Sequence, residues 1–302
     1  MNALLTLLPD FAIIAIGACI GRYIPDAGWR QIDWLSYNIL YPALLFAAAS
    51  QRRIEPDALL LLGLLAFAVV STGFLLSTRI SRLSTDGPAT RAGKLQNAWR
   101  FNTALGFVAV AALPSSASAI LAIIVGIAIP LANLYAILAL TRGQSLSPKA
   151  VLKEVALNPF LLASVAGVVV GLSGRPVPAL LSALVDRLAD AAIPVVLLSL
   201  GAALRSVRLW PPERYAIALH VIKLMVLPGL VWTIAVLCRL DGIVAATLLV
   251  FSALPTASAA HVLAVRYGAE RGSVALVVLQ SSALGLLSLP FWTAAAVRLA
   301  GQ

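Results

Sequence analysis

The sequence predicts an all-α polytopic membrane protein whose ten transmembrane helices form two inverted five-helix repeats. Three observations predict this fold class. Of the 302 residues, 61% are hydrophobic and 11% are charged, whereas a soluble domain carries about 25% charged residues. Apolar runs long enough to cross a bilayer recur along the whole chain, and Pro and Gly residues repeat at a nearly constant offset.

The ten spans are defined by apolar runs that charged residues, Gly and Pro separate. About 20 apolar residues cross a hydrocarbon core of about 30 Å, and the run 58–78, for example, contains no charged residue. The start of the chain lacks the positive segment and cleavage site of a secretory signal, so it is taken as the first span. The spans are expected near residues 4–21, 34–50, 58–78, 97–114, 119–140, 155–172, 188–204, 215–238, 242–265 and 273–297.

The distribution of Lys and Arg predicts the orientation of these spans. A net charge of +10 would suggest nucleic-acid binding in a soluble protein, but here the charges lie between spans, and no nucleic acid is expected as a partner. The loops after odd-numbered spans hold fifteen Lys or Arg residues and the other side holds six, while Lys223 inside span 8 completes the 22. Because basic loops stay in the cytoplasm, both termini are expected on the outer, periplasmic side of a bacterial inner membrane.

An internal repeat relates the two halves, residues 1–148 and 149–302. Five spans in each half force the second half to be inverted in the membrane, an architecture common among secondary transporters. The evidence is a set of Pro and Gly residues that recur in order at offsets of 150 to 152. The pairs are Pro9 and Pro159, Gly17 and Gly167, Gly21 and Gly171, Pro25 and Pro176, and Pro42 and Pro194.

Nearly the same offset pairs Gly106 in span 4 with Pro255 in span 9, each in the middle of its span. Pro removes a backbone hydrogen bond and Gly loosens a helix, so both spans are predicted to be broken and to cross. A rival alignment of ALPSSASA (112–119) with ALPTASAA (253–260) is less favoured because Pro114 falls at the outer end of span 4, and a simple packing kink at Pro255 stays open. Broken helices at membrane depth line a cavity, and their N-termini favour anions.

Polar side chains beside the two breaks are the candidate substrate-binding residues. Their amide and hydroxyl groups could contact a carboxylate, although a Ser or Thr often bonds its own preceding turn and an Asn can bond a neighbouring helix. His261 is either a pH-sensitive contact or a packed neutral residue. The predicted set is Asn102, Thr103, Gly106, Asn133, Pro255, Thr256, Ser258 and His261, with Asn38, Tyr41 and Pro42 in span 2 closing the site from its fixed side.

The positions of the charged residues limit the chemistry of this site. All twelve acidic residues lie in loops or at span ends, which disfavours a carboxylate-based proton relay or metal site, and no cofactor is expected. Coupling to a proton, to a sodium ion held by carbonyl and hydroxyl oxygens, or to no ion stays open. Lys223 either extends to the cytoplasmic interface or attracts an anion.

Five segments resemble the auxin efflux carrier family of membrane transporters, particularly its bacterial members. They are LYPALLF (40–46), WRFNTALGF (99–107), NPFLLA (158–163), IPVVLLSLGAAL (193–204) and ALPTASAAHVLAVRYGAE (253–270). The resemblance covers essentially the whole chain. Two positions depart from the family pattern, since Gly106 stands where plant members have Pro and His261 stands where a Tyr is expected.

The resemblance implies the PIN-like crossover fold, in which spans 4 and 9 cross at the substrate site. It implies a scaffold of spans 1, 2, 6 and 7 (about 4–50 and 155–204) and a transport unit of spans 3–5 and 8–10 (about 58–140 and 215–297). It also implies an elevator-type motion and a homodimer in the lipid bilayer. The implied substrate is a small organic anion, either a dicarboxylate such as malate or malonate or an auxin-like carboxylate.

Three other functions compete with organic anion transport. A sodium-coupled symporter of bile acid symporter type would share the inverted repeat. An intramembrane hydrolase could use Ser258 and His261 as a dyad, but no G-x-S-x-G elbow precedes the Ser. A channel needs a continuous polar lining, and no span carries a polar stripe. A transporter, and not an enzyme, is therefore expected.

Overall fold

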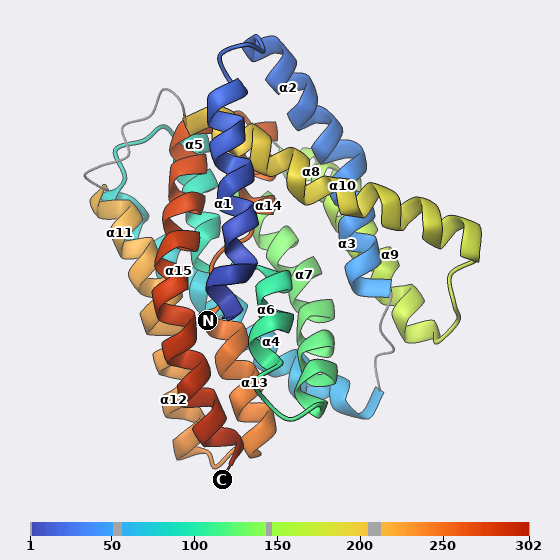
Figure 1. The fold of residues 1–302 in the computed structure, drawn as a ribbon, viewed down its shortest axis with the longest axis vertical. Coiled ribbons are helices and arrows are strands. Elements are labelled where there is room, and N and C mark those ends of the chain that lie inside the picture. The colour runs from blue at the N-terminus through green and yellow to red at the C-terminus, as the bar shows by residue number, and fades with distance from the viewer. Residues whose placement is uncertain (1, 51–55, 143–146, 205–212, 302) are drawn as a thin grey trace.

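The computed structural model describes residues 2–50, 56–142, 147–204 and 213–301, and within these ranges the chain forms helices and no strand (Figure 1). The first half contains α1 (Asn2–Ile20), α2 (Asp26–Leu35), the π-helical turn η1 (Ser36–Leu40), α3 (Tyr41–Ser50), α4 (Pro56–Ile80), η2 (Ser81–Leu83), α5 (Pro88–Leu95), η3 (Gln96–Ala98), α6 (Thr103–Val110) and α7 (Ser116–Arg142). The second half contains α8 (Pro148–Ala156), α9 (Pro159–Ser173), α10 (Ala179–Leu204), α11 (Arg214–Val221), the π-helical turn η4 (Ile222–Val226), α12 (Leu227–Leu237), α13 (Gly242–Ala253), α14 (Ala259–Arg266) and α15 (Arg271–Ala300).

Helices occupy all ten segments in which spans were expected. Among the described residues, five of them are long and apolar enough to cross a membrane, namely Leu60–Leu83, Ser116–Arg142, Ala179–Leu204, Arg214–Leu237 and Arg271–Ala300. The pair Lys149–Ala156 and Pro159–Ser173, bent by 53°, makes a sixth if it counts as one span, and Phe11–Ile20 and Gly242–Ala253 are apolar but shorter. The protein is therefore a multi-pass helical membrane protein with five to six such spans, and the number ten stays a prediction.

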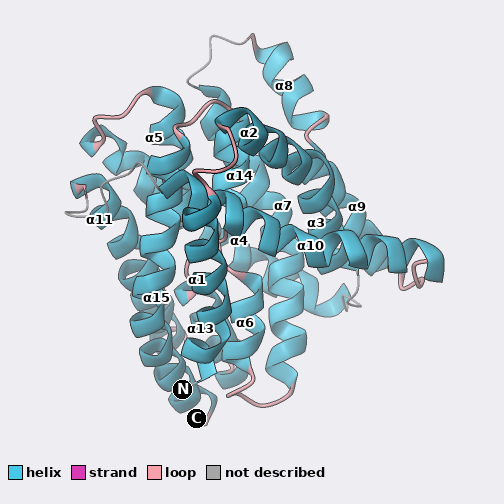
Figure 2. Ribbon diagram, turned by 45° about the horizontal axis from the view of Figure 1, so that its top comes forward, coloured by secondary structure: helices cyan, strands magenta, loops and turns pink. Residues whose placement is uncertain are grey.

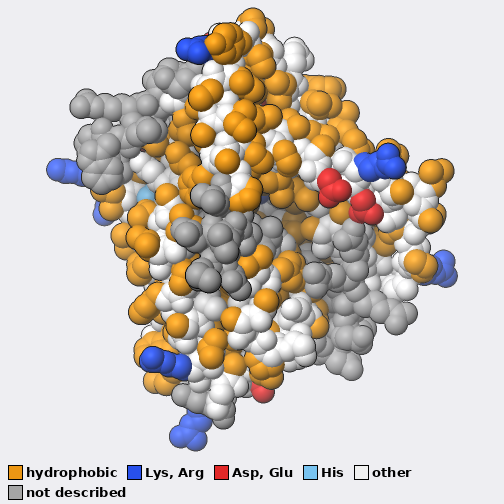
Figure 3. Space-filling view, viewed as in Figure 1, with side chains coloured by type: hydrophobic (Ala, Val, Ile, Leu, Met, Phe, Trp, Pro, Cys, Tyr) orange, Lys and Arg blue, Asp and Glu red, His pale blue; other side chains and the backbone are white. Residues whose placement is uncertain are grey.

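The outer surface has the composition expected for contact with lipid. Hydrophobic side chains cover most of the face seen in Figure 3, and the Lys and Arg side chains gather at its periphery. Leu60, Leu180 and Leu287 are 74%, 87% and 78% exposed. A large, continuous apolar surface of this kind is rare on soluble monomers, whereas the bilayer favours it.

Glycine allows two pairs of helices to approach each other closely. The helix α1 packs along α10, and α3 packs along α9 (Figure 2). A methyl group at Gly17 would overlap the backbone of Leu198, and one at Gly167 would lie 2.8 Å from the carbonyl oxygen of Phe46. These contacts join α1, α3, α9 and α10 into a first helix group, while α4, α7, α13 and α15 pack on one another as a second helix group.

Polar contacts join the turn between α14 and α15 to α2, α8 and α10. Arg271, the first residue of α15, forms an ion pair with the buried Asp33 of α2 at 2.9 Å and donates a hydrogen bond to Ser199 of α10, also at 2.9 Å. Tyr267 in the same turn donates to a carboxylate oxygen of Glu154 in α8 at 2.8 Å. The turn is therefore attached by these side chains to α2, α8 and α10.

Candidate functional site

Two helix interruptions meet in the interior of the molecule. The first, at residues 99–102, separates η3 from α6, and the second, at residues 254–258, separates α13 from α14. The side-chain oxygen of Asn102 accepts a hydrogen bond from the Leu105 amide (3.2 Å), which caps the N-terminus of α6. The Asn102 amide donates to the carbonyl oxygen of Pro255 (2.8 Å). The two interruptions are thus joined directly through their backbones.

The first interruption lies before Gly106, which is inside α6. The expectation that Gly106 itself breaks span 4 is therefore wrong. A single Gly costs a helix little when packing supports it, whereas an Asn side chain competes for backbone amides and favours a helix start. An added methyl group at Gly106 would lie 3.0 Å from the end of the Leu254 side chain, so Gly106 packs beside the second interruption.

The second interruption follows from Pro255, which has no amide hydrogen and clashes with the preceding turn. The backbone groups that lose their helical partners find others nearby. The Thr256 amide donates to Ser281 Oγ (3.1 Å), and the Ser252 carbonyl accepts from Lys223 Nζ (3.1 Å). This satisfaction of buried backbone groups is what membrane depth requires.

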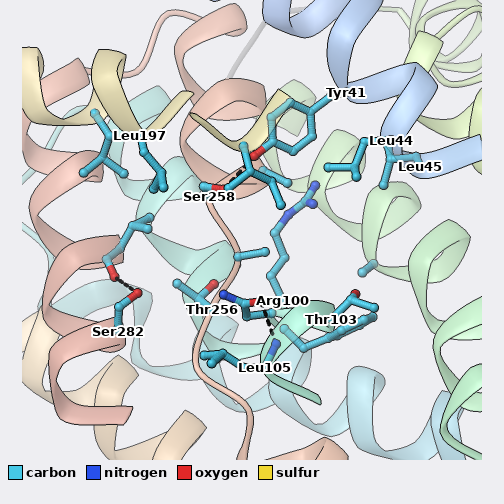
Figure 4. A pocket seen from close by; sticks show the side chains of 18 of the residues that line it. Tyr41, Leu44, Leu45, Arg100, Thr103, Leu105, Leu197, Thr256, Ser258 and Ser282 are labelled. Carbon is cyan, nitrogen blue, oxygen red and sulfur yellow. Dashed lines mark hydrogen bonds between the residues drawn. The ribbon is translucent and has the colours of Figure 1, made fainter. Parts of the chain in front are cut away.

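A cavity of about 370 Å³ lies between the two interruptions and the first helix group, a volume suited to a small molecule. Figure 4 shows Tyr41 and Ser258 at one end of it and Thr103, Leu105 and Thr256 around the other. Its apolar wall includes Phe11, Ile14, Leu44, Leu45, Phe101, Leu105, Ile129, Ile193, Leu197, Leu200, Val278 and Leu279, and its polar wall consists of Tyr41, Arg100, Asn102, Thr103, Asn133, Thr256, Ser258 and Ser282.

Arg100 is the one charged side chain in the described wall of this cavity, and in Figure 4 it extends from between Thr256 and Thr103 toward Tyr41 and Leu44. Its side chain is almost fully buried, at 4% exposure. Its Nε donates to Gln96 Oε1 (2.8 Å) and one Nη donates to Asn133 Oδ1 (3.0 Å). Both partners are neutral, and no ion pair among the described residues includes Arg100. The guanidinium is therefore fixed in place with its charge uncompensated.

Arg100 was missed as a site residue because it was counted among the fifteen loop charges. That assignment is wrong, since the side chain is buried in the cavity wall. The sequence did contain a signal, because residue 100 also falls inside the expected span 97–114. A charge inside a span is costly to bury and marks a functional position more often than a topological one.

Six of the predicted site residues line the cavity: Tyr41, Asn102, Thr103, Asn133, Thr256 and Ser258. The structure brings them together from α3, the first interruption, α6, α7 and the second interruption. Tyr41 Oη and Ser258 Oγ are 2.6 Å apart and share a hydrogen bond, which joins the first helix group to the second interruption (Figure 4).

The other five predicted residues, Asn38, Pro42, Gly106, Pro255 and His261, are not among the residues that line the cavity. Pro255 contacts the wall indirectly, since its carbonyl oxygen accepts the hydrogen bond from the amide of Asn102, which lines the cavity. His261 is fully buried in α14, and neither ring nitrogen has a hydrogen-bond partner among the described residues. Asn38 donates to the Trp34 carbonyl (2.9 Å). Direct substrate contact by these five stays a prediction.

The cavity has the chemistry of an anion-binding site. It combines one fixed cation with the N-termini of α6 and α14, whose backbone dipoles favour negative charge. The described residues contain no group of three or more His, Cys, Asp or Glu side chains that could hold a metal ion. The Ser258 hydroxyl shares its hydrogen bond with Tyr41 and not with His261, which lies outside the cavity, so these two residues are not arranged as a hydrolase dyad. The arrangement can hold a carboxylate at Arg100 and an apolar body against the Leu and Ile side chains.

Two comparisons show which known proteins this chain is similar to. Residues 144–293 match the model of a family described as "Membrane transport protein". Over 299 residues, the chain is 27% identical to a protein of Rhizobium meliloti (strain 1021) described as "Putative malonate transporter". That alignment covers 90% of this chain and 89% of the relative, so the similarity extends to both halves.

Proposed function

Because the chain belongs to the membrane transport protein family, the auxin efflux carrier-like transporters, we propose that it carries small organic anions as a secondary transporter. It is a transporter and not an enzyme, and it works within a membrane that its apolar helices cross. The proposed substrates are carboxylates, either dicarboxylates or auxin-like monocarboxylates. The coupling ion, sodium or a proton, is left open.

The observation that carries this proposal is the buried, uncompensated guanidinium of Arg100 in the cavity wall. A buried charge is strongly unfavourable unless a partner neutralises it. The described wall supplies no carboxylate, so an anionic ligand is the partner that fits. Arg binds carboxylates through two parallel N–H bonds, and the hydroxyls of Thr103, Thr256 and Ser258 in the same cavity wall can accept or donate further bonds.

The proposed architecture is ten spans in two inverted repeats, residues 1–148 and 149–302, with spans 4 and 9 broken and crossing. Two glycine contacts support the repeat. Gly17 in α1 packs on Leu198 in α10, and Gly167 in α9 packs on Phe46 in α3. Adding 150 to Gly17 gives Gly167, and adding 152 to Phe46 gives Leu198, the same offsets that relate Pro9 to Pro159 and Pro42 to Pro194.

The proposed transport cycle is an elevator-type movement of a transport unit, spans 3–5 and 8–10, against a scaffold of spans 1, 2, 6 and 7. The division into two helix groups supports it, since α1, α3, α9 and α10 pack mainly on one another. We also propose a homodimer, a place in the bacterial inner membrane and outward-facing termini. With Arg100 removed from the loop count, the charge bias is fourteen against six and still favours that orientation.

The test is thermal-shift binding of organic acids by the purified protein, with and without sodium. An anion that binds the folded state raises the melting temperature. Arg100→Gln should weaken binding by about tenfold or more, because a bond to a charged group is lost, and Arg100→Lys should recover only part of it, since Lys cannot bind a carboxylate through a planar fork. Arg142→Gln, at the exposed end of α7, is the matched control and should bind normally.

Two outcomes would contradict the proposal. Stabilisation of Arg100→Gln by the same anions, to the same degree as the wild type, would exclude this cavity as the anion site. A folded wild-type protein that no organic acid stabilises would exclude the proposed substrate class.

A further inference from the structure

Lys223 lies in η4, which packs against α4, α13 and α15 of the second helix group, and its side chain is 2% exposed. The π-helical turn η4 places it against the end of α13, and its Nζ donates to the carbonyl oxygen of Ser252 at 3.1 Å. None of the ion pairs among the described residues includes Lys223. It does not line the cavity, so the ammonium has another role than direct contact with a ligand there.

The Ser252 carbonyl is available because α13 ends at Ala253, two residues before Pro255. In a continuous helix this oxygen would accept from the amide of Thr256, four residues on, but that amide donates to Ser281 Oγ instead. The last carbonyls of a helix also form the negative end of its dipole. The Lys223 ammonium therefore lies at the end of α13, where a carbonyl oxygen has no helical partner and the helix dipole gives a negative potential.

A short path of bonds links this contact to the cavity. Ser252 is three residues before Pro255, whose carbonyl accepts from the Asn102 amide (2.8 Å). The Asn102 side chain caps α6 and lines the cavity two residues from Arg100. A displacement of the end of α13 would therefore move the start of α6 and the polar wall of the site.

The first interruption is supported differently. Gly73 in α4 is the counterpart of Lys223 at an offset of 150, and it packs on the end of the half-helix before the first interruption. A methyl group at Gly73 would lie 2.6 Å from the Ala98 carbonyl oxygen. Close backbone packing thus covers the carbonyl end in the first half, whereas an ammonium group binds it in the second half.

We infer that Lys223 is a built-in cation that replaces a bound sodium ion at the second interruption. Broken helices of secondary transporters commonly present carbonyl ends that coordinate a coupling cation. Here a tethered ammonium already binds the carbonyl end of α13. Lys223 is thus a positioning residue, and anion binding by the wild type does not require sodium at this place. The inference rests on the proposed function, because it concerns how the same site is held in shape.

The experiment measures the affinity of malonate and of phenylacetate for the purified protein in sodium chloride and in choline chloride. The wild type and Lys223→Arg should bind equally in both salts. Lys223→Ala should lose about tenfold in affinity in choline, the effect of removing a hydrogen bond from a charged donor. Sodium or added ethylammonium should restore much of this loss, since the deleted side chain leaves space for a small cation. Lys223→Met fills that space and should not be rescued.

The outcomes separate the inference from the proposed function. Unchanged affinity of Lys223→Ala in choline, a loss that neither sodium nor ethylammonium reverses, or sodium-dependent binding by the wild type would each overturn the role of Lys223. Absence of binding by the folded wild type in either salt would instead contradict the proposed function, and the inference with it. Lys223→Arg keeps the test decisive if the smaller variants fail to fold, because a sodium requirement in this variant would also overturn the role.

Discussion

Asn102 and Arg100 occupy neighbouring positions in the cavity wall, and Asn102 has a second role as the cap of α6. Asp caps a helix as well as Asn does. The variant Asn102→Asp should therefore keep the helix and place a negative charge where the anion binds. We expect about a tenfold or greater loss of anion affinity from like-charge repulsion, with the melting temperature of the unliganded protein unchanged, both measured by thermal shift.

Ser147, the cap of α8, provides the control for this change. Its side chain accepts from the Ala150 amide (3.3 Å) at an exposed position outside the cavity. Ser147→Asp should leave anion affinity unchanged. Wild-type affinity in Asn102→Asp would contradict the placement of the anion beside the start of α6.

At the scale of elements, the packing of α15 on the second interruption predicts a difference between two glycines. A methyl group at Gly285 would lie 2.8 Å from the rigid ring of Pro255, whereas one at Gly106 would meet the flexible ends of Leu254 and Leu121 at 3.0 and 3.2 Å. Gly285→Ala should therefore lower the melting temperature and the anion affinity, since overpacking costs about 1–3 kcal/mol. Gly106→Ala should change both only slightly, and equal effects of the two changes would refute this account of the interruption.

A second prediction at this scale concerns the turn between α14 and α15. Asp33→Asn or Arg271→Gln leaves one charge of a buried pair without its partner, which weakens the attachment of this turn to α2, a helix that packs on α10 of the first helix group. If the two groups move against each other, each variant should expose the cavity more often. The rate at which an impermeant maleimide labels Ala48→Cys, in a protein whose exposed Cys19 and Cys238 are replaced by Ser, should rise several-fold.

The charge-exchanged double variant Asp33→Arg with Arg271→Asp is the control. It should return the labelling rate of Ala48→Cys toward the rate measured with Asp33 and Arg271 unchanged. Labelling that none of these changes affects would argue against a gating role for the ion pair.

At the scale of the whole molecule, the sequence predicted the helical membrane class and the positions of the helices because apolar composition is a property of long segments. It predicted the second interruption because Pro255 breaks a helix by its own covalent structure. It misplaced the first interruption, because Asn102 starts α6 by accepting a hydrogen bond from the Leu105 amide, and whether an Asn side chain makes such a bond depends on the local backbone geometry. Arg100 was missed for a related reason: whether an Arg near a span end faces the cytoplasm or a cavity depends on the tertiary packing of α7 and η3.

The most direct measurement is uptake of the best-binding labelled organic anion into liposomes that contain the purified protein and are preloaded with the same unlabelled anion. We expect saturable uptake by the wild type and by Arg142→Gln, and uptake near that of protein-free liposomes by Arg100→Gln. Wild-type uptake by Arg100→Gln, or no exchange by a folded wild-type protein that binds the anion, would contradict transport of an organic anion through this cavity.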